Sequence, residues 1–264
     1  GKYGEHSTVD TTPFRVGVKY IEDKHNLGTI DLETVLAKSS NVGMSKIALS
    51  LEPEVIYDTL TRLGFGQVTT SGYPGESAGV LTHYSHWRPI GIVTMSYGYG
   101  LSVTPLQLAH AYATIGAGGV SRPISFLRVD EPPAGEQALD PHVARTLVSL
   151  LRGVVSKNGT GVQASIPGYT VAGKTGTAWK SNAGGYATDR YQAVFGGVAP
   201  ASNPRLAAIV MIDEPSAGKY YGGDVAAPVF SGVVGGALRL LAGAPDATIV
   251  PASEDGVAQQ VALR

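Results

Sequence analysis

The spacing of apolar residues predicts helices in the first part of the chain, with one polar interruption. Leu32–Lys38 follows Asp31, a residue type favoured at helix N-caps, and helical spacing resumes over Val42–Leu51. Between these segments, the small polar residues of Ser39–Asn41 compete with a helix for backbone hydrogen bonds. A third helix is expected to begin at Pro53, since proline suits the first turn. The pattern therefore predicts two helices that meet at a polar junction.

Two later prolines mark the starts of further helices, and loops are expected around them. Thr104-Pro105 and Asp140-Pro141 each pair an N-cap residue with a first-turn proline, and apolar residues follow both at helical spacing. Residues 1–30 have the composition of loop with short strands. Residues 64–103, rich in Gly, Tyr, Ser and His, are expected to form a long structured loop. This part of the chain is therefore predicted to consist of helices and loops without a large sheet.

The last third of the chain has the pattern of strands. Tyr169–Ala172, Tyr191–Phe195 and Leu206–Ile212 carry β-branched and aromatic residues. The turn-like segment Ala199–Pro204 predicts that the last two strands form an antiparallel hairpin. Pro228–Leu241 has the spacing of a final apolar helix. Helices followed by an antiparallel sheet and a covering helix indicate an α+β fold.

Composition excludes several classes of protein. The 264 residues carry 20 basic and 21 acidic side chains, a net charge of -1, which argues against nucleic acid as a partner. Hydrophobic residues make up 43% and charged residues 16%, so the chain is expected to fold. The absence of cysteine excludes disulfides, thiolate metal sites and a cysteine nucleophile. No apolar run in the sequence reaches the ~18 residues of a membrane span.

Two short polar motifs carry the residue types that serine acyl transfer requires. Ser39-Ser40-Asn41 lies at the predicted helix junction, and Lys174-Thr175-Gly176-Thr177 lies on a predicted strand. Ser39 together with a lysine can shuttle protons near a nucleophile, and the Asn41 amide can orient a substrate amide. Lys174, Thr175 and Thr177 can hold a substrate carboxylate by charge and hydroxyl groups. This interpretation requires that folding bring the two motifs together.

The second motif also suits a substrate that lies along a strand. Gly176 removes the side chain where a substrate backbone would run, and the Thr177 N–H is placed to form half of an oxyanion hole. Aromatic residues near glycines are candidates for the walls of a substrate channel, with ordinary packing as the alternative. They are Tyr97, Tyr99, Trp179, Tyr220 and Tyr221.

Three further patterns point to other chemistry but fail in their context. Gly168–Thr175 matches the P-loop of ATPases, and Ile209–Glu214 resembles a magnesium-binding strand. A P-loop opens a helix, whereas the glycine-rich polar residues that follow here cannot start one. Gly159-Thr160-Gly161 approximates a dinucleotide fingerprint but follows a helix. His83 and His86 have no third ligand at an obvious spacing, so neither a metal nor a cofactor is predicted.

In this order, the serine and lysine motifs resemble those of the penicillin-binding protein and serine β-lactamase superfamily. Longer segments are similar to class B penicillin-binding proteins of the division-specific type (the penicillin-binding protein 3 group). These segments are Lys38–Gly43, Tyr97–Gly100, Val103–Ala109, Ala172–Ala178 and Tyr220–Gly223 leading into Ala226–Phe230. The likeness implies a partial transpeptidase domain over residues 1–242, with an antiparallel sheet packed with helices, and a C-terminal tail over residues 243–264.

The resemblance also implies an activity. It is that of a D,D-transpeptidase, which cross-links peptidoglycan stem peptides ending in D-Ala-D-Ala through a serine acyl-enzyme and is acylated by β-lactams. It implies that Ser39 relays protons, that Asn41 positions the substrate and that Lys174, Thr175 and Thr177 hold its carboxylate. Two alternatives stay open: a hydrolase of the carboxypeptidase or β-lactamase kind, which uses water as acceptor, and a non-catalytic β-lactam-binding domain.

The family's setting is implied as well. It is the periplasmic side of the bacterial inner membrane, with an N-terminal anchor that is absent from this sequence. The expected partners are the upstream half of the same protein and membrane proteins of the division complex.

One family motif has no good match. Ser-x-x-Lys supplies the nucleophile and its base and should precede Ser39, yet Ser7–Asp10 ends in aspartate instead of lysine. Ser216–Lys219 fits letter for letter, but Pro215 and Gly218 disfavour the helix that would place serine and lysine on one face. We therefore expect the nucleophile to lie slightly upstream of Gly1. The sequence would then be the C-terminal larger part of the domain.

Overall fold

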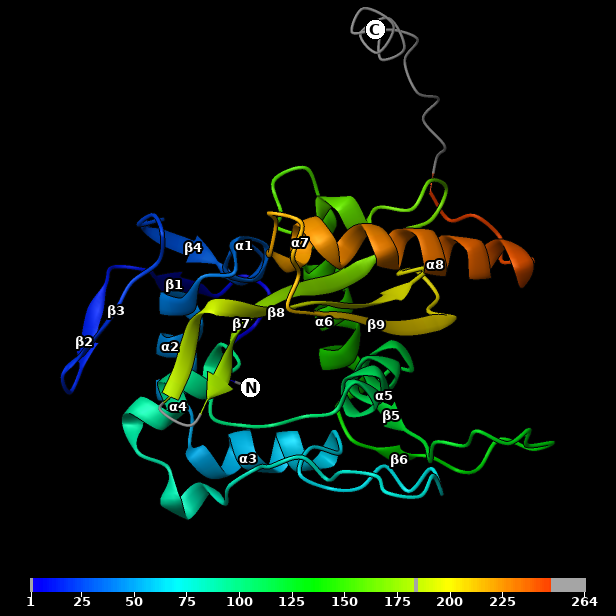
Figure 1. Ribbon diagram of the computed structural model, residues 1–264, viewed down its shortest axis with the longest axis horizontal. Helices are drawn as coiled ribbons and strands as arrows, with labels where there is room; N and C mark the ends of the chain where they lie inside the picture. Colours follow the sequence, from blue (N-terminus) through cyan, green and yellow to red (C-terminus); the bar gives the residue numbers. More distant parts are fainter. Residues whose placement is uncertain (1, 183–184, 248–264) are drawn as a thin grey trace, which may run out of the picture.

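A computed structural model describes residues 2–182 and 185–247 of the chain (Figure 1). Its main sheet has three antiparallel strands in the order β7–β8–β9. These strands are β7 (Ala172–Asn182), β8 (Gly185–Ala199) and β9 (Leu206–Asp213). The register places Lys174 opposite Gly196 in the first pair, and Phe195 opposite Val210 in the second. The predicted antiparallel hairpin is confirmed.

Helices lie on both faces of this sheet, which confirms the predicted α+β class. They are α8 (Ala227–Leu240) on one face, and α5 (Pro105–Gly116) and α6 (Pro141–Val155) on the other (Figure 1). Phe195 and Phe230 are fully buried between the sheet and α8, with ring centroids 4.8 Å apart. On the opposite face, Leu151 of α6 packs with Val198 of β8. Burial of these apolar side chains is the main stabilising contribution to the fold.

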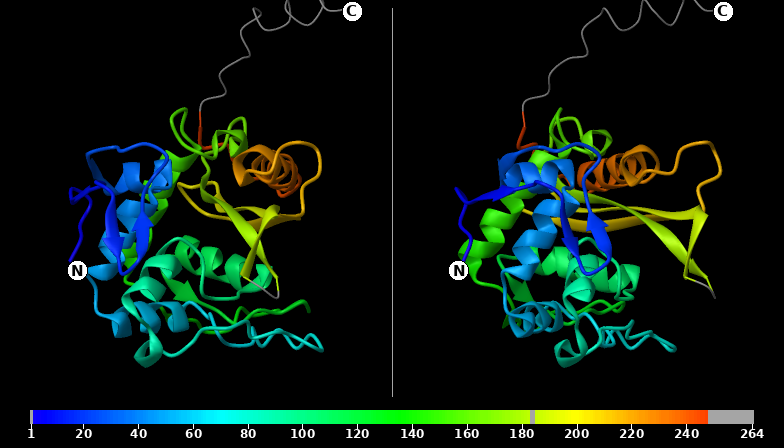
Figure 2. Two further views of the ribbon diagram at one scale, coloured as in Figure 1. Left: turned by 60° about the vertical axis from the view of Figure 1, so that its left-hand side comes forward. Right: turned by 90° about the vertical axis from the view of Figure 1, so that its left-hand side faces the viewer.

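The N-terminal part of the chain forms small sheets and two helices beside the main sheet. Its strands are β1 (Thr8–Asp10), β2 (Phe14–Val16), β3 (Lys19–Ile21) and β4 (Thr29–Asp31), paired as β1–β4 and β2–β3. Helix α1 (Leu32–Lys38) contacts α6, which contacts β7 in turn (Figure 2). Helix α2 (Asn41–Leu49) packs against α4 (Pro89–Ser96) through Val42 and Val93. The junction predicted between two helices is therefore the α1–α2 junction.

The prediction of a loop over residues 64–103 is wrong in part. Residues 89–96 form α4, with a proline at the first turn and with Ile92 and Val93 buried. Gly91 and the surrounding glycines concealed this helix in the sequence, whereas packing against Val42 stabilises it in the fold. Residues between α3 (Pro53–Arg62) and α4 are held partly by Gln107, a buried side chain that donates to the carbonyl oxygens of Gln67 and Ala78 at 2.8 and 2.9 Å.

Helix ends follow the caps expected from the sequence. Asp31 accepts a hydrogen bond from the Thr34 N–H at 2.8 Å, and Asp140 accepts one from the His142 N–H at 2.8 Å. Thr104 and Gln107 form a reciprocal capping box. The remaining elements are α3 (Pro53–Arg62), η1 (Tyr84–His86), β5 (Val120–Ser121), β6 (Glu136–Gln137), η2 (Val162–Ala164) and α7 (Gly222–Val225). Among the residues described, no helix is both long and apolar enough to cross a membrane.

The predicted tail begins with residues that bond the segment before β7 and the turn between β8 and β9. The Tyr169 hydroxyl donates to the Gly243 carbonyl oxygen at 2.7 Å. The Asp246 carboxylate accepts from the Thr170 N–H at 2.7 Å, and also from the hydroxyls of Thr170 and Ser202. Residues 248–264 of this tail lie outside the described part of the chain.

Candidate active-site cleft

The α1–α2 junction presents Ser39 and Asn41 on a tightly bonded turn. Ser39 caps the C-terminus of α1 in the left-handed conformation, with φ 56° and ψ 46°. Serine adopts this conformation at a cost of about 1–2 kcal/mol, so the surrounding contacts must hold it there. Ser40 ends α1 by donating its N–H to the Val35 carbonyl oxygen at 2.9 Å, and it begins α2 by accepting from the Gly43 N–H at 2.9 Å. One residue thus closes one helix and opens the next.

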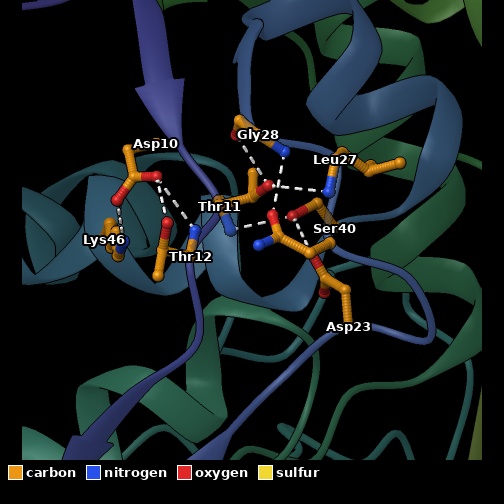
Figure 3. Close-up of polar contacts among 10 residues, drawn as sticks. Asp10, Thr11, Thr12, Asp23, Leu27, Gly28, Ser40 and Lys46 are labelled. Atoms are coloured by element: carbon orange, nitrogen blue, oxygen red, sulfur yellow. Dashed lines mark hydrogen bonds and ion pairs between the residues drawn. The ribbon is translucent and has the colours of Figure 1, made fainter.

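A carboxylate from a distant loop clamps this turn. Asp23, between β3 and β4, accepts from the Ser40 hydroxyl at 2.5 Å and from the N–H groups of Asn41 and Val42 at 2.6 and 3.1 Å. Figure 3 shows Asp23 pointing at Ser40. The free N–H groups at a helix start favour a negative charge, which adds to the strength of these bonds.

The loop that carries Asp23 is held by Thr11, the residue that follows β1. Thr11, fully buried, donates its hydroxyl to the Gly28 carbonyl oxygen at 2.8 Å and accepts from the Leu27 N–H at 3.2 Å (Figure 3). Asp10, next to it, forms an ion pair with Lys46 of α2 at 2.7 Å. The hydrogen bonds of Thr11 hold the loop that carries Asp23, and through Asp23 they hold the position of the junction.

Folding brings the two motifs into direct contact, as the acyl-transfer interpretation requires. The Lys174 Nζ donates to the Ser39 hydroxyl at 2.8 Å, although the two residues are 135 positions apart. Lys174 lies on β7, an edge strand of the main sheet that β8 pairs on one side. The backbone groups on the other edge of such a strand can bond an extended ligand.

The environment of Lys174 changes its proton affinity. Burial in the cleft lowers its pKa from 10.5 to about 8, because removal from water disfavours the charged form. At neutral pH the ammonium form still predominates, yet the neutral form is within reach. A lysine in this state can bind a carboxylate and can also exchange a proton with the adjacent Ser39 hydroxyl.

Thr177, the residue that follows Gly176 on β7, is hydrogen-bonded to the start of α7. Its hydroxyl accepts from the Gly222 N–H at 3.0 Å, which leaves the hydroxyl proton for another acceptor. A Cβ on Gly222 would lie 2.3 Å from the Val194 carbonyl oxygen and 2.4 Å from that of Gly176. Only glycine therefore allows α7 to approach the motif strand so closely.

Tyrosines form the walls beside the motif strand. The Tyr99 ring contacts those of Tyr97 and Tyr186, with centroids 6.1 and 4.9 Å apart, and its hydroxyl accepts from the Trp179 N–H at 3.2 Å. Across the site, Tyr220 stacks on Tyr191 at 4.2 Å and contacts Tyr221 at 4.4 Å. Rigid aromatic side chains of this kind suit an apolar part of a ligand.

All the predicted site residues line one open cleft of about 1030 Å³. They are Ser39, Asn41, Tyr97, Tyr99, Lys174, Thr175, Gly176, Thr177, Tyr220 and Tyr221. Trp179 lies among them as a half-exposed wall residue and not in the core. Asp23 is not among the predicted site residues, because its contacts are made only in the fold. A lone aspartate in a polar loop gives no signal of its own.

The residues of the rejected patterns lie in a strand, an irregular segment and the cap of a short helix. Lys174 lies inside a strand, so Gly168–Thr175 is not a P-loop. Ser216–Lys219 lies in the irregular segment between β9 and α7, with Gly218 at φ 76°. His83 packs its ring on Tyr84 and bonds the Ser85 hydroxyl at 2.9 Å. Among the residues that the structure describes, no three His, Cys, Asp or Glu side chains gather as metal ligands do.

A helix junction that carries Ser-x-Asn touches an edge strand that carries Lys-Thr-Gly, and the resemblance to penicillin-binding proteins rests on these two motifs. The chain matches the protein family described as "Penicillin binding protein transpeptidase domain" over residues 1–235, and it belongs to that family. The resemblance noted from its motifs is confirmed.

Curated relatives include proteins named as peptidoglycan D,D-transpeptidases. The chain is 45% identical over 247 residues to "Peptidoglycan D,D-transpeptidase FtsI" of Escherichia coli (strain K12), an alignment that covers 94% of this chain and 42% of that protein. It is 40% identical over 253 residues to "Probable peptidoglycan D,D-transpeptidase PenA" of Neisseria gonorrhoeae, covering 96% of this chain and 44% of the relative. The chain thus spans less than half the length of these relatives.

A solved structure shares the fold. The "TP domain from Burkholderia pseudomallei penicillin-binding protein 3", in its apo form, superposes with a TM-score of 0.89 at 40% sequence identity. The superposition covers 94% of this chain and 76% of that one. The predicted fold class is therefore confirmed at the level of the family.

Proposed function

We propose that this chain forms the substrate cleft of a serine D,D-transpeptidase that cross-links peptidoglycan stem peptides and that β-lactams acylate. The observation that carries the proposal is the 2.8 Å contact between Lys174 Nζ and the Ser39 hydroxyl, in a cleft bordered by a free strand edge. Both relatives described above bear the name peptidoglycan D,D-transpeptidase, which supports the same activity.

The reaction needs a serine nucleophile, which we assign to a Ser-x-x-Lys motif upstream of Gly1 in the longer protein. Its oxygen attacks the carbonyl carbon of the penultimate D-Ala, the C–N bond breaks, and the terminal D-Ala leaves with the proton from the serine. An amine from a neighbouring stem peptide then attacks the ester, loses its proton and restores the serine. A β-lactam follows the first step by opening its ring.

Residues of this chain bind and orient the substrate. The Lys174 ammonium and the hydroxyls of Thr175 and Thr177 hold the terminal carboxylate, while the Asn41 amide pairs with the substrate amide. The Ser39 hydroxyl, bonded to Lys174, relays a proton to the leaving amine. Gly176 leaves room for the acyl chain along β7, the Thr177 N–H provides part of an oxyanion hole, and the tyrosines border the channel.

The cellular location and the partners are proposed from the same family membership. The full protein would be anchored by an upstream segment and would work on the periplasmic face of the inner membrane. Its partners would be the upstream half of the same chain and membrane proteins of the division complex.

Covalent labelling tests the proposal. The full-length protein is incubated with a fluorescent penicillin, and the labelled fraction is followed on denaturing gels. Lys174→Ala should abolish most labelling. The matched control is Lys180→Ala on the same strand, since Lys180 pairs with Asp213 and Glu214 and not with the motif. Unimpaired labelling of Lys174→Ala would remove the carboxylate-binding role.

A second measurement identifies the acceptor. Single-turnover reactions with a D-Ala-D-Ala peptide are run with and without an added amine. A cross-linked product supports the transpeptidase. Free acid alone would identify a hydrolase of the carboxypeptidase or β-lactamase kind, and slow labelling without any product would identify a non-catalytic binding domain.

A further inference from the structure

The loop that follows α6 touches both motif-bearing elements. It comprises residues 156–161 and connects α6 to η2. The Thr160 N–H donates to the Ala37 carbonyl oxygen at 3.1 Å, in the last turn of α1 and two residues before Ser39. The Thr160 hydroxyl lies 2.8 Å from the Thr175 hydroxyl on β7. One residue thus links the helix that leads to Ser39 with the strand that carries Lys174.

The backbone of this loop is closely held. The Lys38 Nζ donates to the Asn158 carbonyl oxygen at 2.8 Å, and the Gly161 N–H donates to the Val154 carbonyl oxygen at 2.9 Å. Gly223 of α7 passes so close that a Cβ there would lie 2.2 Å from the Thr160 carbonyl oxygen. The position of Thr160 is therefore fixed from α1, α6 and α7, and its hydroxyl is presented to Thr175 from a rigid backbone.

Counting protons determines the direction of the hydroxyl pair. Each hydroxyl has one proton to donate and two lone pairs that can accept. If Thr175 is to donate its proton to a substrate carboxylate, it cannot donate to Thr160 at the same time. Thr160 must then be the donor, with the Thr175 oxygen as acceptor. This arrangement turns the Thr175 proton away from Thr160 and leaves it for the ligand.

We propose that Thr160 is a positioning residue for carboxylate binding, which orients the Thr175 hydroxyl toward the ligand. The inference deepens the proposed function and rests on it, because that function supplies a ligand with a carboxylate. Thr160 itself acts through Thr175.

The test compares a carboxylate ligand with its uncharged ester in the full-length protein. The probes are benzylpenicillin and its methyl ester, with the dissociation constant and the acylation rate constant measured separately. Thr160→Val removes the hydroxyl and keeps the branched shape, whereas Thr160→Ser keeps the hydroxyl. For Thr160→Val we expect binding of the acid to weaken about 3–10-fold, the size of one exposed hydrogen bond. The acylation rate constant and ester binding should stay within about twofold, and Thr160→Ser should match the wild type.

A matched control and a double variant exclude a general effect on folding. Thr146→Val makes the same change on α6, where Thr146 bonds Glu5 outside the cleft, and should leave acid binding unchanged. In a Thr175→Val background, Thr160→Val should have no further effect on acid binding. Equal loss for acid and ester, failure of Thr160→Ser to restore binding, or simple addition of the two losses would overturn the inference.

The two proposals can fail separately. If the wild-type protein is not acylated, the proposed function fails, and the role of Thr160 is then decided by reversible binding of an N-acylated D-Ala-D-Ala peptide and its C-terminal amide. Weaker binding of the acid alone in Thr160→Val would support the inference. An equal effect on acid and amide, or no binding of either, would overturn it.

Discussion

Replacing Asp23 by alanine should loosen the α1–α2 junction and slow acylation. The carboxylate accepts from the Ser40 hydroxyl and from the N–H groups of Asn41 and Val42, at 2.5, 2.6 and 3.1 Å. Asn41 is exposed, so water can replace the bond to its N–H, whereas Val42 is fully buried. Hydrogen bonds to a charged group contribute about 1.5–3 kcal/mol when they cannot be replaced, and about 1 kcal/mol otherwise.

The free energy of holding the junction should therefore fall by about 2–4 kcal/mol. Ser39 depends on this support, because it is held in a left-handed conformation that serine disfavours. A loss of 2 kcal/mol corresponds to about 30-fold and one of 4 kcal/mol to about 900-fold, so we expect the acylation rate constant divided by the dissociation constant to fall about 30–900-fold. Asp23→Asn keeps one accepting oxygen, so its ratio of acylation rate constant to dissociation constant should lie between those of the wild type and Asp23→Ala.

The assay is stopped-flow labelling of the full-length protein by a fluorescent penicillin, with thermal unfolding measured alongside. The control is Asp10→Ala, which removes an exposed partner of Lys46 on the same helix and should label as the wild type does. Labelling of Asp23→Ala within about twofold of the wild type, with an unchanged melting temperature, would refute the argument that this carboxylate positions the junction.

Four further predictions concern charge, close packing and the tail. Burial lowers the pKa of Lys174 from 10.5 to about 8, so between these pH values the unfolded chain binds a proton that the folded chain has lost. The free energy of unfolding, measured relative to Lys174→Met by urea titration, should therefore rise as the pH is raised from about 8 to 10.5. A difference that does not change with pH would contradict this prediction. Binding of carboxylate ligands should weaken over the same rise in pH through about 8, in calorimetric titrations, because the ammonium charge is lost. Gly222→Ala places a Cβ about 1 Å too close to two carbonyl oxygens and should destabilise the fold by about 1–3 kcal/mol. The control is Gly232→Ala on α8, where nothing lies within 4 Å of the added Cβ, and it should be neutral or stabilising. Equal melting temperatures for the two variants would contradict this prediction. Asp246→Ala should lower the melting temperature, because it leaves the Thr170 N–H without its acceptor. The control is Asp130→Ala, which removes an exposed carboxylate paired with Arg128 and should not change the melting temperature. Similar melting temperatures for the two variants would show that Asp246 does not anchor the tail.

Local chemistry was enough to predict several helix starts and the β8–β9 hairpin, whereas the strand expected over Tyr169–Ala172 begins only at Ala172, as β7. N-cap residues and first-turn prolines marked the starts of α5 and α6, and the polar triplet at Ser39 marked the break between α1 and α2. These signals act over a few residues, so they can be recognised without knowledge of the fold. Where packing overrode the local signal, prediction failed: α4 contains Gly91 and forms because Ile92 and Val93 are buried.

The sequence by itself determined the chemistry of the cleft, because the serine and lysine motifs have recognisable residue types in a recognisable order. Only the tertiary structure decided how these groups are held. The clamp by Asp23, the link through Thr160 and the lowered pKa of Lys174 depend on contacts between residues far apart in the chain, or on removal from water. Such contacts leave no pattern in the spacing of residues, since they exist only once the hydrophobic core has placed the elements that carry them.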